Sequence, residues 1–206
     1  LLVSVYTTQA QMTLIPKAGA TYSNLSVSDE YLDGAPKFES KIGFVLGAAL
    51  EIGLNDMLAI QPELLFIQKG GMQEDSEDGY EVKRTNTINY LELPVMVKVK
   101  FSKFYVNAGP SLSYGLGGKS KFEVTDGNDK FETSNKIKFG EEPANNEDDY
   151  YLDNAMDIGI QVGAGGKVGP VVVDLRYGLG MTDLLDEPEG FSGDWKFKNG
   201  SFQLTV

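Results

Sequence analysis

Strict alternation of apolar with small or charged residues over positions 41–66 constrains the fold more than any other feature of this sequence. In the first half of the stretch every second residue is apolar, namely Ile42, Phe44, Leu46, Ala48, Leu50, Ile52 and Leu54. The polar pair Asn55 and Asp56 then marks a tight reversal, after which the alternation resumes through Phe66. A period of two predicts β-strands with one apolar and one polar face. The stretch therefore predicts a long hairpin, whose apolar face meets either a protein core or lipid.

The same alternation recurs along the chain and predicts eight strands. They cover residues 14–25, 42–54, 60–66, 91–101, 104–116, 156–165, 171–179 and 201–206. The second, fourth and sixth connections are short turns, whereas the first, third, fifth and seventh are long, polar and acidic. Outer-membrane barrels have short turns at one rim and long external loops at the other. This rhythm predicts an all-β, eight-stranded antiparallel up-and-down transmembrane β-barrel with long acidic external loops.

In such a barrel the apolar side chains face lipid, while glycine, small polar and charged residues face the lumen. Aromatic residues near the strand ends are then expected to form interfacial girdles; these are Tyr22, Phe44, Phe66, Tyr90, Phe101, Phe104, Tyr114 and Tyr177. Two other interpretations remain open at this point. One is a narrow transport pore for small solutes, and the other is a soluble lipocalin-like ligand-binding barrel, which needs its apolar residues to point inward.

Composition excludes several classes of function. The net charge of −12 and the lack of a basic stripe argue against a nucleic-acid partner. The sequence has no cysteine and no histidine, which removes thiolate ligands, disulfides and the commonest general base. It also lacks a recognisable nucleophile motif. We therefore predict no enzymatic activity, no cofactor, and neither catalytic nor metal-ligating residues.

Charged residues on the predicted lumen face are the candidate functional site. They are Lys17, Glu51, Glu63, Glu92, Lys98, Lys100, Asp157, Asp174 and Arg176. An eight-stranded barrel has an interior just wide enough for side chains to fill, and an unpaired charge buried there is costly. We therefore predict a network of ion pairs rather than an acid–base pair for glycoside hydrolysis. In this network Arg176 and the lysines pair with the glutamates.

The first ten residues resemble the end of a secretory signal. An apolar run leads to a small residue, Ala10, at a plausible cleavage point. A first β-strand is the alternative interpretation. The signal interpretation predicts export, a residual signal segment over residues 1–10, and a single barrel domain over 11–206 whose last strand is truncated.

Four segments together resemble one known family. They read GFVLGAALEIGLNDMLAIQPELLF, NYLELPVMVKVKF, FYVNAGPSLSYGL and DIGIQVGAGGKVG followed by VVVDLRYGLGMTDL. In combination they are similar to the PorT-type outer-membrane β-barrel family of Gram-negative bacteria. The resemblance implies an exported barrel in the outer membrane and brings no catalytic residues. For such a barrel we predict a structural or interaction role. It implies contact with outer-membrane lipid and makes other envelope or secretion-apparatus proteins candidate partners.

Overall fold

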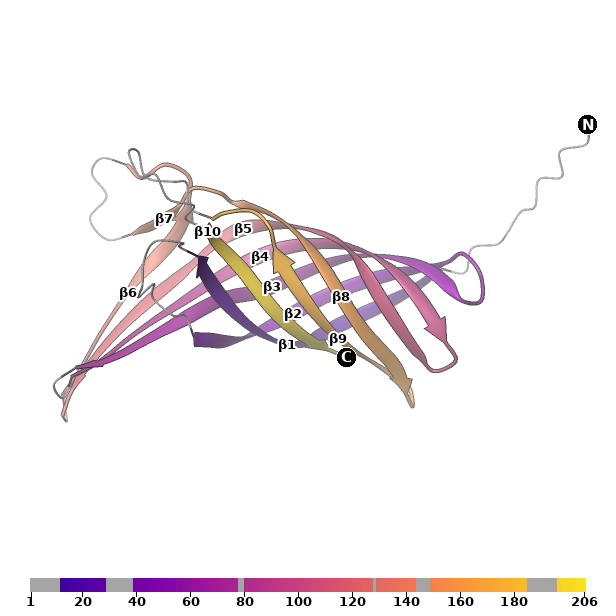
Figure 1. Cartoon of the computed structure of the whole chain (residues 1–206), viewed down its shortest axis with the longest axis horizontal. Coiled ribbons are helices and arrows are strands. Elements are labelled where there is room, and N and C mark those ends of the chain that lie inside the picture. The colour runs from indigo at the N-terminus through magenta and orange to yellow at the C-terminus, as the bar shows by residue number, and fades with distance from the viewer. Residues whose placement is uncertain (1–11, 29–38, 78–79, 128, 144–148, 185–195) are drawn as a thin grey trace, which may run out of the picture.

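A closed ring of eight antiparallel strands forms the body of the molecule (Figure 1). The computed structural model describes residues 12–28, 39–77, 80–127, 129–143, 149–184 and 196–206. The ring consists of β1 (Met12–Ser28), β2 (Glu39–Gly53), β3 (Leu58–Glu77), β4 (Tyr80–Phe101), β5 (Phe104–Asp126), β8 (Met156–Val168), β9 (Val171–Gly180) and β10 (Lys196–Thr205). Pairing of β10 with β1 and of β5 with β8 completes the circle. The predicted eight-stranded antiparallel up-and-down barrel is confirmed.

Two further strands, β6 (Asp129–Phe139) and β7 (Tyr150–Leu152), lie outside the ring. β6 continues from β5 as a hairpin, and β7 pairs with β6 in parallel. Together with the ends of β3, β4 and β5, β6 builds a sheet that runs past the ring at the rim of the long connections (Figure 1). We call this the projecting sheet; it comprises residues 71–77, 80–89, 117–126 and 129–139.

The projecting sheet corrects the prediction that the third and fifth connections are long loops. Glu77 pairs with Tyr80 and Asp126 pairs with Asp129, so strands replace most of both predicted loops. The backbone ladder continues although the side chains no longer alternate between apolar and polar. The first and seventh connections fall mainly on residues 29–38 and 185–195, which lie outside the described residues, as does the predicted signal segment at 1–10.

A β-bulge marks the boundary between the ring and the projecting sheet. Asn89 pairs with Gly117 and Tyr90 with Gly115, so Leu116 is the extra residue on β5. Gly117 has a φ of 108°, a conformation that favours glycine. The extra residue changes the parity of β5: even-numbered residues face outward up to Leu116, and odd-numbered residues such as Lys119 face outward beyond it.

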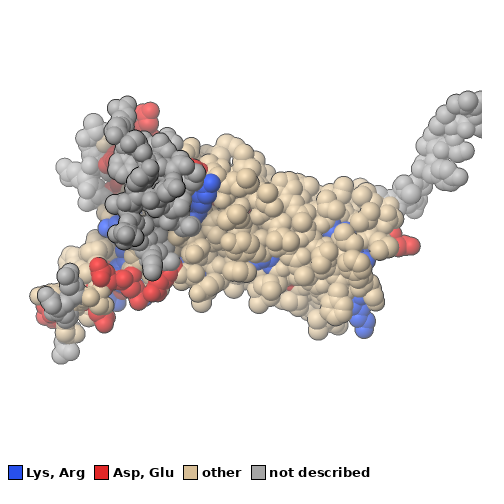
Figure 2. All heavy atoms as spheres, in the orientation of Figure 1, with Lys and Arg blue, Asp and Glu red and all other residues tan. Residues whose placement is uncertain are grey.

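The ring places its apolar side chains outward, as predicted. On β4, Leu93, Val95 and Val97 keep 47%, 45% and 52% of their surface exposed, whereas the intervening Met96 is fully buried in the lumen. This sidedness is the reverse of that of a lipocalin-like barrel. On the face shown in Figure 2 the ring is mostly uncharged, and acidic residues gather at the tip of the projecting sheet.

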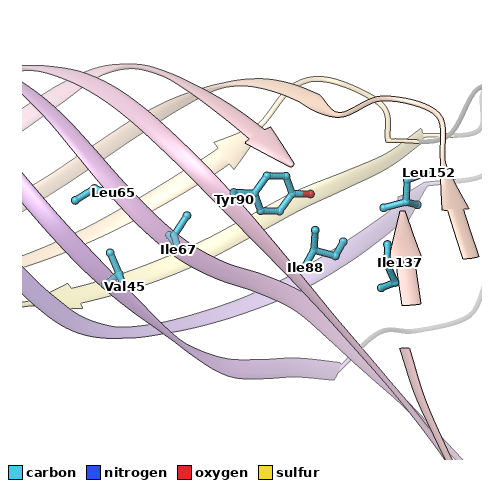
Figure 3. Packing of buried hydrophobic residues seen from close by; sticks show 7 residues of the cluster. All are labelled: Val45, Leu65, Ile67, Ile88, Tyr90, Ile137 and Leu152. Carbon is cyan, nitrogen blue, oxygen red and sulfur yellow. The ribbon is translucent and has the colours of Figure 1, made fainter. Parts of the chain in front are cut away.

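One predicted girdle residue lies inside instead. Tyr90 is fully buried in the lumen, where it belongs to an apolar cluster with Val45, Leu65, Ile67, Ile88, Ile137 and Leu152 (Figure 3). The cluster spans β2, β3 and β4 and reaches β6 and β7. The lumen near the rim of the long connections therefore contains a packed apolar cluster, in addition to the glycine, small polar and charged residues that were predicted there.

The described part of the chain contains no helix that is long and apolar enough to cross a membrane.

Candidate functional site: the charged lumen

Two cations and two carboxylates form a compact cluster in the middle of the lumen. The Arg176 guanidinium donates two hydrogen bonds to Glu63, from Nη2 to Oε1 at 2.7 Å and from Nη1 to Oε2 at 3.0 Å. Lys17 Nζ lies 3.1 Å from Glu63 Oε2 and 3.5 Å from Asp174 Oδ1. Arg176 Nε lies 2.5 Å from the same Asp174 oxygen. The four charges sum to zero, and three strands supply them: β1, β3 and β9.

Neutral donors complete this cluster. The Tyr105 hydroxyl donates to Asp174 Oδ2 at 2.7 Å, and Asn107 Nδ2 donates to the same oxygen at 2.8 Å. Space for the aliphatic stem of Arg176 comes from Gly163, which pairs with Arg176 in the ladder between β8 and β9. A Cβ at this glycine would lie 2.6 Å from Arg176 Cγ. The glycine is therefore part of the site, because it makes room for the longest lumen side chain.

A second group of charges lies toward the rim of the short turns. Lys98 Nζ contacts Glu51 Oε2 at 2.8 Å, and Lys100 Nζ contacts Glu51 Oε1 at 3.2 Å. Lys98 Nζ also lies 4.0 Å from the centroid of the Tyr105 ring. Tyr105 thus links this group to the central cluster.

The third group surrounds Glu92, and its cation was missed by the sequence analysis. Lys69 Nζ lies 2.5 Å from Glu92 Oε2, and Ser113 donates to the same oxygen at 2.9 Å. Gln161 Nε2 donates to Glu92 Oε1 at 2.7 Å. Lys69 belongs to the same inward row of β3 as Glu63, two residues beyond Ile67. Extending the period of two by two steps would have found it, but the predicted strand ended at residue 66.

Asp157 differs from the other predicted lumen charges because its described partner is an amide. Asn199 Nδ2 lies 3.1 Å from Asp157 Oδ2 and 3.1 Å from the Tyr90 hydroxyl. A cavity of about 10 Å³ lies beside Asp157, lined also by Lys69, Gln161 and Asn199. Such a volume accommodates about one water molecule. The lumen is packed here as well.

The charged side chains of the lumen form ion pairs with one another and leave little space for a substrate. Eight of the nine predicted residues form ion pairs, with Glu63, Glu51 and Asp174 as acceptors inside the predicted set and Lys69 supplying the partner of Glu92. Glu63 and Glu92 are almost fully buried. Among the described residues, no group of three or more acidic residues is placed to hold a metal ion. The ion pairs therefore connect different strands of the barrel across its lumen.

Comparison with known proteins identifies the kind of chain. The family model described as "Outer membrane protein beta-barrel domain" matches residues 9–186. No curated protein matches the sequence.

Among solved structures, the chain is similar to neisserial surface protein A, with 12% identity over 95% of this chain and 96% of that one, at a TM-score of 0.47. It is similar to the attachment invasion locus protein Ail of Yersinia pestis, with 13% identity over 96% and 97% of the two chains, at a TM-score of 0.40. CarO2 of Acinetobacter baumannii shares 12% identity over 93% of this chain and 98% of its own, at a TM-score of 0.38.

Proposed function

This chain belongs to the outer membrane protein β-barrel domain family, and on that premise we propose that it is a non-conducting barrel that carries the projecting sheet as a structural or interaction element. As a member of this family it lies in the outer membrane, in contact with lipid. The proposal concerns what the barrel does there. The observation that carries it is the lumen, which is braced by three groups of ion pairs and also contains a packed apolar cluster.

The packed lumen favours a structural or interaction role over transport of small solutes. The exposed fraction is at most 3% for each of Arg176, Glu63 and Glu92, which lie in the lumen. Opening a path for solutes would separate these pairs inside a low-dielectric interior, which is costly. The same pairing argues against a catalytic carboxylate, so we propose no enzymatic activity.

The projecting sheet offers the surface for an interaction. It exposes aromatic side chains that lie beyond the lipid-facing ring: Phe131 is 66% exposed and Tyr80 is 50% exposed. Tyr150 of the neighbouring β7 is 43% exposed. Aromatic residues are enriched in protein interfaces, where they bury much area at little conformational cost. We place the sheet on the external side, because outer-membrane barrels keep their short turns in the periplasm.

The finer assignments rest on the sequence. Segments such as QPELLF and YLELPV support a PorT-type barrel within the family. We further propose that residues 11–206 form a single barrel domain, with 1–10 as the remainder of an export signal that is cleaved. Other envelope or secretion-apparatus proteins are the partners that this assignment suggests.

Conductance in planar lipid bilayers tests the proposal. The folded barrel is expected to insert without stepwise current, because buried ion pairs between described residues occupy its lumen. A heat-unfolded sample of the same preparation controls for detergent leakage. Steady unitary conductance from the folded protein would contradict a closed lumen and favour the narrow transport pore.

A further inference from the structure

Three buried acceptor oxygens belong to side chains that line the cavity beside Asp157. They are Asp157 Oδ1, Gln161 Oε1 and Asn199 Oδ1, and none of them accepts a hydrogen bond from the described part of the chain. Each of the three residues is at most 2% exposed, so bulk water does not solvate them. Buried polar atoms are nearly always hydrogen-bonded, and exceptions indicate strain, a bound water or a bound ion.

The hydrogen bonds of both amides fix which of their atoms is the oxygen. Gln161 Nε2 donates to Glu92 Oε1 at 2.7 Å, and Asn199 Nδ2 donates to Asp157 Oδ2 at 3.1 Å. An ionised carboxylate only accepts hydrogen bonds, so the NH2 group of each amide must face it. Neither amide can therefore turn its nitrogen toward the position of the unpartnered oxygen without losing one of these bonds.

The charges around the cavity do not cancel. Lys69 is the one cation among the described residues that line it, and its ammonium pairs with Glu92 Oε2 at 2.5 Å. With the carboxylate of Asp157 the group holds one ammonium and two carboxylates, whereas the central cluster of the lumen is neutral. The Lys69 ammonium and the backbone N–H of Thr182 also act on the Asp157 carboxylate, but neither donates a hydrogen bond to its Oδ1. One further positive charge would neutralise this buried group, in which excess charge is costly.

Glycines create the space in which such a charge fits. Gly159, Gly178 and Gly180 line the cavity from β8 and β9, and a Cβ at Gly180 would lie 2.6 Å from Asp157 Oδ2. The volume of about 10 Å³ accommodates one particle of the size of a water molecule. The cavity is therefore large enough for a single dehydrated ion.

The surrounding atoms suit a cation better than a water molecule. A single water has two hydrogens and cannot donate to three acceptors at once, whereas a cation attracts all of the oxygens around it. Hard cations bind carboxylate and amide carbonyl oxygens, and hydroxyls such as those of Ser111 and Ser201 also line the cavity. The excess of one carboxylate favours a monovalent ion over a divalent one.

We propose that this cavity binds one sodium ion through Asp157 Oδ1, Gln161 Oε1 and Asn199 Oδ1. The ion neutralises the charge that Lys69 leaves uncompensated, and it satisfies the three acceptors. Its ligands come from β8 and β10, which flank β9 in the ring, so the ion ties three strands together. Sodium takes oxygen ligands, so a chain without cysteine and histidine can still hold a metal ion. The inference depends neither on what the projecting sheet binds nor on whether the lumen conducts.

Sodium dependence of unfolding in the folded full chain tests the proposal. The barrel is unfolded by urea in neutral detergent while sodium chloride is replaced stepwise by choline chloride, whose cation is too large for the cavity. An ion that binds only the folded state stabilises it by mass action. Well above the dissociation constant, the unfolding equilibrium constant should therefore fall about tenfold for each tenfold rise in sodium concentration. Equilibrium dialysis with radioactive sodium should count a single saturable ion per barrel.

Two variants address the site itself. Asp157→Asn keeps the shape of the side chain but removes its charge, and it should abolish both the sodium dependence and the saturable binding. Gly178→Ala adds a methyl group to the wall of the cavity, 3.5 Å from Gln161 Cγ and from Ser201 Oγ, which is ordinary van der Waals contact. The methyl group takes up space in the cavity without a clash, so this variant should fold and also lose the sodium dependence.

Glu51→Gln is the matched control, because it removes a lumen carboxylate that does not line this cavity and pairs with Lys98 and Lys100. It should keep the sodium dependence of the wild type, and heat-modifiable gel mobility checks that each variant is folded. Equal stability of the wild type in sodium and in choline would mean that water or a proton satisfies Asp157, and would overturn the proposal. Sodium binding that persists in Asp157→Asn or Gly178→Ala, or that is lost equally in Glu51→Gln, would overturn it as well.

Discussion

Replacing Arg176 with methionine is expected to lower the free energy of unfolding by about 3–5 kcal/mol, the usual cost of breaking a buried ion pair from one side. The guanidinium makes two hydrogen bonds to Glu63 and an ion pair with Asp174. In the variant, Lys17 alone faces both buried carboxylates. Methionine preserves much of the side-chain volume, so the loss reports charge rather than packing. Equilibrium unfolding by denaturant in lipid vesicles measures it.

The sequence offers a matched control, because Arg84 is its only other arginine. Arg84 lies over the rings of Phe122 and Tyr150 on the projecting sheet, at 5.8 and 5.6 Å, rather than in the lumen. Arg84→Met is therefore expected to cost about 0.5–1 kcal/mol. Adding Glu63→Gln to Arg176→Met should recover part of the stability, since it removes the carboxylate that the guanidinium no longer neutralises. If Arg176→Met and Arg84→Met cost the same, the central cluster does not brace the barrel.

Placing a charge on the outward face of β4 is expected to have the second largest effect. Val95 lies near the middle of the outward apolar row that runs from Leu91 to Phe101. An arginine near the bilayer midplane of a β-barrel costs about 2–4 kcal/mol. Val95→Arg should therefore lower the free energy of unfolding in vesicles by that amount, because the guanidinium would face hydrocarbon.

Thr85→Arg is the matched control for this effect. Thr85 belongs to the same outward row of the same strand, but it lies in the projecting sheet opposite Lys121. There the added arginine would meet water and the like charge of Lys121, so the expected cost is at most about 1 kcal/mol. A cost at Thr85 equal to that at Val95 would mean that the hydrocarbon boundary does not fall between these two positions.

Much of the ring could be predicted from the sequence because lipid and lumen impose opposite demands on successive residues. The alternation is clear in the sequence where both faces of a strand are constrained. On β4, Leu93, Val95 and Val97 face outward, whereas Glu92, Met96 and Lys98 face the lumen. The pairing of Arg176 with Glu63 followed from the cost of buried charge. The ion pair between Lys69 and Glu92 could not be predicted, because the outward-facing residues of β3 become polar near Lys69.

The projecting sheet could not be predicted because, apart from Ile88 and Ile137 in the apolar cluster at its base, its described apolar residues are not buried in lipid or in a core. Its outward row of threonine, lysine and glutamate is compatible with a loop as well as with a strand. The bulge at Leu116 also reverses the parity of β5, so a single period fitted across it fails. Tyr90 was misplaced for a related reason: an aromatic residue suits both an interfacial girdle and the apolar end of the lumen.

Nitroxide accessibility at two positions of β4 tests the central claim, which is that the apolar face of the ring meets lipid. The sequence has no cysteine, so single cysteines at Val95 and Thr85 can be labelled without background. In vesicles, the label at Val95 should collide freely with dissolved oxygen and be shielded from a water-soluble nickel complex, and the label at Thr85 should show the reverse. An immobile label at Val95 shielded from both reagents, or one reached by the nickel complex, would contradict the account.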